Sequence, residues 1–310
     1  MRAPGLQSLP LRPATSVELQ RALDAFNKWR FGYGLSPRDD DGDDRNEVEN
    51  RNRELRYVEG ERARVGHRAC EAPDDPDAFV AWFDALETSG PGQHDPLFDW
   101  LEKAASLDQL TWVLRQEIAG EAGFDDLATL AQAKGPARPR LSLAGNIMEM
   151  AGGGTTTRSG GAMLSQLAAG LGVALPAPAE IVPEALAQAN LLSALAAHRR
   201  YAYPSIGALG VIELTAPGRV AKFCAGLERL GPGTLEEIVS KLTIDLRPGP
   251  PHPATDRATR PEAWNRDVLR ALVAADPRVA RPLAEGALMR LEAGARCFDR
   301  YRWDLWGATV

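Results

Sequence analysis

The sequence predicts an all-α protein built as a helical bundle. Apolar residues recur at intervals of three and four along most of the chain, as they do on the buried face of a helix. Segments with the alternating pattern of a half-buried strand are nearly absent. Capping residues and helix-starting prolines precede several of the apolar segments. These observations favour helices packed around a shared hydrophobic core.

Two amphipathic helices are predicted in the first half of the chain. The segment DDPDAFVAWFDALE places Phe79, Trp82, Phe83 and Leu86 at helical spacing. The segment SLDQLTWVLRQEIAGEAGFDDLATLAQ repeats this spacing from Leu110 to Ile118, and its first residue, Ser106, is a typical N-cap. We therefore expect each helix to turn one face towards the core.

Three more helices are predicted in the second half. GGAMLSQLAAGLG has an apolar face and ends near a glycine, and VPEALAQANLLSALAAHRR has Pro183 near its first helical position. The third, DPRVARPLAEGALMRLEAGARCFDRYRWDLW, aligns the apolar residues Val279, Leu283, Leu288, Leu291 and Phe298. The arginines and tryptophans at its end either pack this helix or anchor a partner.

Three stretches interrupt the helical pattern. Residues 36–56 form a strongly charged connection, and we expect a solvated loop there rather than a Mg²⁺ site. Residues 152–161 are rich in glycine, and residues 246–261 are rich in proline. We expect one domain overall, with an N-terminal helical segment and its charged connection over 1–60 and the helical bundle over 61–310.

Composition restricts the class of function. A net charge of −6 argues against a nucleic-acid or anionic-membrane surface, and no apolar run approaches the roughly 20 residues of a membrane span. No apolar signal segment follows the N-terminus, and Cys70, Cys224 and Cys297 are scattered without a CxxC motif. We expect a cytoplasmic protein that acts on a small molecule and has no nucleic-acid or membrane partner.

Short motifs give little support to a metal or phosphate site. The histidines His67, His94, His198 and His252 are isolated, without the spacing of paired metal ligands. His94 directly precedes a predicted helix, where capping is its ordinary role. The stretch GGGTTTRSGG lacks the Lys-Ser/Thr ending of a P-loop. It is either a phosphate-binding turn at a helix N-terminus or a flexible connection.

Several segments taken together resemble a known family. HDPLFDWLEKAASLDQLTWVLRQE, GFDDLATLAQ, LSLAGNIMEMAGGG, QANLLSALAAHRR, SIGALGVIELTAPGRV, GLERLG and EGALMRLEAG occur in this order over roughly residues 90–300. This order resembles the iron-containing redox enzymes of the haem-oxygenase-like diiron superfamily. The resemblance implies a haem-oxygenase-like helical bundle, a homodimer, and oxidation of small metabolites by O₂ at two irons.

The resemblance also assigns candidate ligands. Glu117 in LRQEIAG matches the first-helix glutamate of the family, Glu213 in GVIELTAP the next helix-borne glutamate, and Asp245 in KLTIDL the late aspartate. These three carboxylates would hold a metal if one binds.

The histidine ligands of the family are missing from the matching positions. NIMEMAGGG keeps Asn146 and places Glu149 and Met150 where the family has an aspartate and a glutamate, and Gly160 stands at a histidine position. Lys241 stands at a later histidine position. The glycine-rich stretch is therefore interpreted as an eroded ligand segment, and no cofactor is expected.

The sequence leads to a metal-independent biosynthetic enzyme as the first hypothesis. Its predicted catalytic residues are Glu117, Glu213, Asp245 and Lys241, and its predicted substrate-binding residues are Asn146, Glu149, Met150 and Arg219. Buried carboxylates that have lost their metal are expected to be protonated or paired, and a buried glutamate beside a lysine suits acid–base chemistry. One alternative is an iron-dependent oxidoreductase that uses the surviving carboxylates. Another is a non-catalytic accessory protein whose carboxylates form a structural salt-bridge network.

Overall fold

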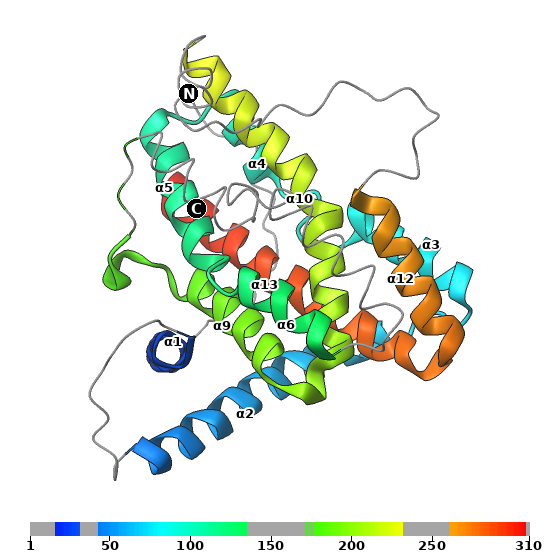
Figure 1. Cartoon of the computed structure of the whole chain (residues 1–310). Helices are drawn as coiled ribbons and strands as arrows, with labels where there is room; N and C mark the ends of the chain where they lie inside the picture. Colours follow the sequence, from blue (N-terminus) through cyan, green and yellow to red (C-terminus); the bar gives the residue numbers. More distant parts are fainter. Residues whose placement is uncertain are drawn as a thin grey trace.

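The computed structural model shows a protein made of helices (Figure 1). The described residues are 16–31, 43–134, 172, 174, 176–231 and 261–307. Every element of secondary structure in these ranges is an α-helix or a 3₁₀-helix. The prediction of an all-α protein is confirmed. The helix expected at GGAMLSQLAAGLG lies outside the described residues apart from its last glycine.

The helices follow one another along the chain with short connections where the chain is described. The α-helices are α1 (Val17–Phe31), α2 (Asp43–Ala69), α3 (Pro76–Ser89), α4 (Pro96–Lys103), α5 (Leu107–Gly120), α6 (Phe124–Lys134), α9 (Pro183–Ala197), α10 (Ala202–Leu230), α12 (Pro261–Ala275) and α13 (Ala280–Trp306). The 3₁₀-helices are η1 (Pro178–Glu180), η2 (Arg199–Tyr201) and η4 (Pro277–Val279).

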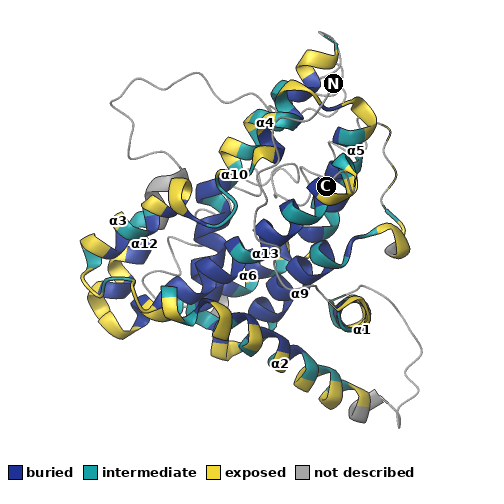
Figure 2. Ribbon diagram, turned by 180° about the vertical axis from the view of Figure 1, so that it is seen from behind, coloured by how far each residue is buried: buried dark blue, intermediate teal, exposed yellow. Residues whose placement is uncertain are grey.

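The centre of the bundle is formed by α9 and α13. Every residue of α9 over 185–196 is buried, as expected for a helix that neighbours cover on all sides (Figure 2). α9 contacts α1, α5, α6 and α13, and α13 also packs against α2 and α10. The apolar face predicted for α13 is confirmed, because all five of its aligned apolar residues are buried.

The crossing of α10 and α13 brings the two backbones into contact. A Cβ atom added to Gly207 would lie 1.9 Å from the carbonyl oxygen of Leu283. A Cβ atom added to Gly286 would lie 2.0 Å from the carbonyl oxygen of Pro204. Glycine at both positions therefore allows the close approach of the two helices.

Side-chain caps fix the starts of α4 and α5. Ser106 and Gln109 form a capping box at α5, which confirms the predicted N-cap. The cap of α4 is Asp95, whose carboxylate accepts the N–H of Leu97. The capping role expected for the exposed His94 is therefore wrong. The carboxylate of the next residue is the stronger acceptor for the free N–H groups of the first turn.

The charged connection expected over 36–56 is wrong for residues 43–56, which form the first half of α2. Ion pairs one turn apart stabilise this helix, as between Arg51 and Glu47, 2.5 Å apart. Glu54, which is 1% exposed, lies on the inward face of this helix. A helix whose contacts are mostly polar has no apolar periodicity to reveal it. Residue 60, the expected boundary, lies inside α2.

Hydrogen bonds between amides fasten α1 to α9. The Asn27 amide donates to Asn190 Oδ1 over 2.9 Å, and the Asn190 amide donates to the carbonyl and side-chain oxygens of Gln20, both at 2.9 Å. All three side chains are buried. Because each amide has a partner, burying these polar groups does not leave unpaired donors in the interface.

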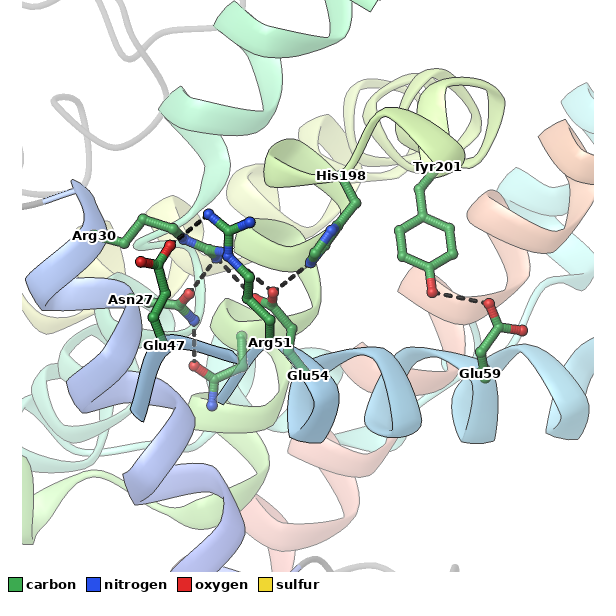
Figure 3. Close-up of polar contacts among 9 residues, drawn as sticks. Asn27, Arg30, Glu47, Arg51, Glu54, Glu59, His198 and Tyr201 are labelled. Atoms are coloured by element: carbon green, nitrogen blue, oxygen red, sulfur yellow. Dashed lines mark hydrogen bonds and ion pairs between the residues drawn. The ribbon is translucent and has the colours of Figure 1, made fainter. Parts of the chain in front are cut away.

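A group of charged side chains joins the end of α1 to α2 and to the end of α9 (Figure 3). Arg30 donates to both oxygens of Glu54, at 2.7 and 3.0 Å, and His198 Nε2 lies 2.5 Å from Glu54 Oε2. Burial alone would raise the pKa of Glu54, but the hydrogen bonds from His198 and Arg30 lower it below its ordinary value. We name Arg30, Glu54 and His198 the Glu54 cluster.

The end of α13 packs against α4. Arg302 lies 3.3 Å from the Asp95 carboxylate, and the rings of Trp100 and Trp306 meet edge-on with centroids 5.7 Å apart. Packing, one of the two roles predicted for this end, is therefore observed, and Trp303 stays 49% exposed.

None of the helices in the described part of the chain is long and apolar enough to cross a bilayer. Cys70, Cys224 and Cys297 are all free thiols.

Candidate functional site

A second group of buried and partly buried polar side chains lies where α9 contacts α5, α10 and α13. Its members project from the end of α5, the middle of α9, the second half of α10 and both halves of α13. We name this group the Arg–Glu cluster. It consists of Glu117, Glu121, Gln188, Arg219, Arg290 and Tyr301.

Arg290, Glu121 and Gln188 form a closed hydrogen-bonded triangle. Arg290 Nη2 donates to Glu121 Oε1 in a short ion pair, and its Nη1 donates to Gln188 Oε1 over 3.0 Å. The Gln188 amide in turn donates to Glu121 Oε1 over 3.1 Å. Arg290 is only 4% exposed, so this is a buried ion pair with an additional amide partner.

The local sequence makes room for this triangle. A Cβ atom at Gly294 would lie 2.9 Å from Arg290 Nη1, and one at Gly120 would lie 3.0 Å from Gln188 Nε2. Glu121 is the C-cap of α5, where the helix dipole disfavours a negative charge. The Arg290 guanidinium supplies the positive charge that offsets this unfavourable position.

Glu117 lies one helical turn before Glu121 and is held differently. Its Oε1 atom is inaccessible and has no hydrogen-bond partner among the described residues. Burial raises the pKa of Glu117, and the negative charge of Glu121 raises it further. Arg219, Arg290 and the nearby Tyr301 hydroxyl oppose this shift in part. The balance favours a protonated carboxyl group.

Tyr301 closes the cluster on the α13 side. It is 0% exposed, and its hydroxyl lies beside the Glu117 carboxyl group and the Cys297 thiol without forming a hydrogen bond of good geometry to a described residue. Burial and the charge of Glu117 raise the pKa of Tyr301 well above its ordinary value. The hydroxyl therefore stays neutral and can donate a proton in a hydrogen bond.

Arg219 brings a second guanidinium to the cluster. Its Nη1 donates to Thr215 Oγ1 over 3.0 Å, and its guanidinium carbon lies 5.7 Å from the centroid of the Phe298 ring. Burial lowers the pKa of Arg219 to about 10, and the like charge of Arg290 acts in the same direction. No ion pair joins Arg219 to a carboxylate of the described residues.

The structure brings two of the predicted site residues, Glu117 and Arg219, into one cluster. Glu213 lies half-buried on α10, and neither a hydrogen bond nor an ion pair joins it to Glu117 or Arg219. The other predicted site residues lie outside the described residues. They are Asn146, Glu149, Met150, Lys241 and Asp245.

Sequence reasoning missed four members of the cluster. Glu121 lies four residues after Glu117, and this spacing on one helix face was a signal for a carboxylate pair. Arg290 interrupts the apolar run EGALMRLEAG, and a charge at a buried helix position is a signal of a paired site. Gln188 and Tyr301 gave no local signal.

The chain belongs to the family of iron-containing redox enzymes, haem-oxygenase-like proteins whose family model matches residues 111–295. The match covers more than half of the chain, and it confirms the predicted resemblance and the predicted haem-oxygenase-like fold. It begins inside α5 and ends inside α13, so it spans most of the Arg–Glu cluster. No curated protein and no solved structure matches the chain.

The described residues of this cluster do not fit a diiron centre. Carboxylates and histidines are the ligands that such irons need, whereas the described residues include no group of three His, Cys, Asp or Glu side chains placed to hold a metal. Of the described histidines, His67 and His94 are exposed and His198 bonds to Glu54, whereas His252 lies outside the described residues. The cation beside Glu121 is the Arg290 guanidinium.

Proposed function

We propose that the protein is an enzyme of small-molecule biosynthesis that carries out metal-independent acid–base chemistry at the Arg–Glu cluster. The observation that supports this most directly is the ion pair between Arg290 and Glu121. A guanidinium that is hydrogen-bonded to a carboxylate and an amide cannot give way readily to a metal ion. Its charge also balances a carboxylate that would otherwise need a metal.

Glu117 is the proposed proton donor and acceptor. Its raised pKa keeps a proton on the carboxyl group at higher pH than an exposed glutamate would, which suits a general acid. Once the proton has moved to the substrate, the carboxylate can act as the base in the return step, with Arg219 and Arg290 stabilising its charge. The neutral Tyr301 hydroxyl is available to orient a polar group of the substrate.

Family membership supports an alternative, an iron-dependent oxidoreductase. In that case Glu117 and Glu213 would supply carboxylate ligands, as the resemblance implies. The interlocked Arg290, Glu121 and Gln188 side chains support the other alternative, a structural salt-bridge network in a non-catalytic relative. The homodimer, the cytoplasmic location and the roles of Lys241 and Asp245 remain predictions.

The test is conversion of a small-molecule extract by purified protein, followed by mass spectrometry. The protein is stripped with a chelator and assayed without O₂, alongside Glu117→Gln and the control Glu102→Gln on α4. Conversion that survives these conditions and is lost only in Glu117→Gln is the expected result. Conversion that needs added Fe²⁺ and O₂ would establish the oxidoreductase instead. An unchanged extract under both conditions would favour a non-catalytic protein.

A further inference from the structure

Arg219 is a cation that lacks a carboxylate partner in a region that contains two carboxylates. Glu121 already accepts from Arg290 and Gln188. Glu117 lies near enough to influence the pKa of Arg219 but forms no ion pair with it. Lys222, three residues further along the same helix, does have a carboxylate partner, Asp99, 2.5 Å away. Arg219 is partly buried, and a guanidinium that is partly withdrawn from water and lacks a counterion is unfavourable unless an anion or water completes its hydrogen bonding.

The Arg219 side chain is held in a fixed orientation. The Thr215 hydroxyl that accepts from Nη1 donates in turn to the carbonyl oxygen of Val211 over 2.8 Å, so the hydroxyl cannot rotate freely. The guanidinium carbon lies over the Phe298 ring, 5.7 Å from its centroid. A guanidinium has five N–H donors, and the structure uses one of them here. The remaining donors are thus oriented for a ligand before it binds.

Two further donors in the cluster are buried and have no partner within the described ranges. They are Arg290 Nε and the Tyr301 hydroxyl, on residues that are 4% and 0% exposed. Buried polar groups without a partner are rare, and each one indicates a water molecule or ligand that completes its hydrogen bonding. Both donors belong to the same cluster as Arg219, so one acceptor group near Glu117 would serve them together.

We propose that Arg219 binds the carboxylate group of a small-molecule ligand, with Tyr301 and Arg290 as additional donors. A planar carboxylate has two acceptor oxygens that match the guanidinium fork. A doubly charged phosphate fits less well, because the Glu121 carboxylate adds negative potential to the same region. This inference gives the chemical class of the substrate in the proposed function. It rests on that function only in calling the ligand a substrate, whereas carboxylate binding at Arg219 does not depend on it.

The experiment uses formate as the probe, because it is a carboxylate with no side group to fit. Arginine Nε–H signals of the ¹⁵N-labelled full chain are followed by NMR during titration with sodium formate at constant ionic strength. Formamide, which has the same shape without the charge, is the control ligand. We expect a saturable shift of the Arg219 signal with formate and none with formamide. Assignment comes from the signal that disappears in Arg219→Gln.

Variants separate this site from other arginines. Arg219→Gln is expected to weaken formate binding at least tenfold, about 1.4 kcal/mol. Arg300→Gln, which removes a pair with Asp304 on the exposed side of α13, is the matched control and should bind like wild type. Arg219→Lys keeps the charge and should bind more weakly than wild type but more tightly than Arg219→Gln. Thermal unfolding confirms that each variant is folded.

Three results would overturn the proposal. They are the absence of a formate-induced shift in wild type, equal responses to formate and formamide, and tighter binding of inorganic phosphate than of formate. Failure of the proposed function is a separate outcome. If formate binds at Arg219 but conversion requires iron, the proposal of acid–base catalysis is contradicted and the proposal of a carboxylate site is supported.

Discussion

The two buried charged clusters of this protein are built from similar side chains but differ in how completely they are paired. In the Glu54 cluster, both carboxylate oxygens of Glu54 accept hydrogen bonds from cationic side chains, and the pKa of Glu54 is lowered. In the Arg–Glu cluster, Glu117 keeps an unpartnered oxygen and its pKa is raised. The pairing of both Glu54 oxygens serves to fasten α1, α2 and α9 together, although Arg30 Nε has no partner among the described residues. Incomplete pairing is typical of a site that awaits a ligand or a proton.

The largest expected effect is on stability at the Glu54 cluster. Glu54→Leu leaves Arg30 and His198 without their carboxylate in a buried interface, and we expect a loss of about 4 kcal/mol in the free energy of unfolding. Urea unfolding measures this loss. The control Glu49→Leu, on the exposed side of the same helix, should change the free energy by less than about 0.5 kcal/mol. Equal effects of the two variants would contradict a structural role for Glu54.

The next effect concerns the ion pair of the Arg–Glu cluster. Arg290→Met leaves Glu121 buried and uncompensated, and we expect a loss of about 3 kcal/mol. The double variant Arg290→Met with Glu121→Gln should recover most of that loss, because no unpaired charge then remains. Urea unfolding of the four proteins forms a double-mutant cycle. Additive losses would show that the two groups do not act as a pair.

Helix prediction from this sequence succeeds where burial is apolar and fails where it is polar. The apolar spacing of α3, α5, α9 and α13 is sufficient to find them, because each has a face or surface in the core. The first half of α2 was missed, because pairs such as Arg51 and Glu47 give a helix no apolar period.

The candidate site was only partly accessible from the sequence. Glu117 was found through a motif, and Arg219 was proposed as a substrate contact. The pairing of Glu121 with Arg290 joins residues 169 positions apart, and only tertiary packing brings them together. The remaining predicted residues lie outside the described ranges, so their positions stay predictions.

The pH dependence of stability should have opposite signs at the two glutamates. The pKa of Glu54 is lowered from 4.5 on folding, so its contribution is present above pH 4.5 and is lost as the pH falls through the folded-state value. The pKa of Glu117 is raised from 4.5, so the wild type loses stability relative to Glu117→Gln as the pH rises above 4.5.

Urea unfolding between pH 3.5 and 8 measures how the free energy of unfolding changes with pH. Each glutamate should change this free energy by about 1.4 kcal/mol in total for each unit of its pKa shift. The wild type is compared with Glu54→Leu and with Glu117→Gln. If the two differences in the free energy of unfolding changed with pH in the same direction, they would contradict the difference in pairing between the clusters.

The smallest effect compares two buried tyrosines. The Tyr57 hydroxyl donates to the carbonyl oxygen of Ala187 over 2.7 Å, whereas the Tyr301 hydroxyl has no partner in the described part of the chain. We expect Tyr57→Phe to lower the free energy of unfolding by about 1 kcal/mol and Tyr301→Phe to leave it within about 0.5 kcal/mol of wild type. A larger loss for Tyr301→Phe would place that hydroxyl in the structural network.

We propose that guanidinium groups, rather than iron, balance the carboxylates of the Arg–Glu cluster. The most direct test is the metal content, by inductively coupled plasma mass spectrometry, of protein reloaded anaerobically with excess Fe²⁺ and then desalted. Arg290→Met, in which Glu121 has lost its cation, is measured in parallel. We predict far less than one iron per wild-type chain. Near-stoichiometric iron in the wild type would contradict the claim and return the protein to O₂-dependent oxidation.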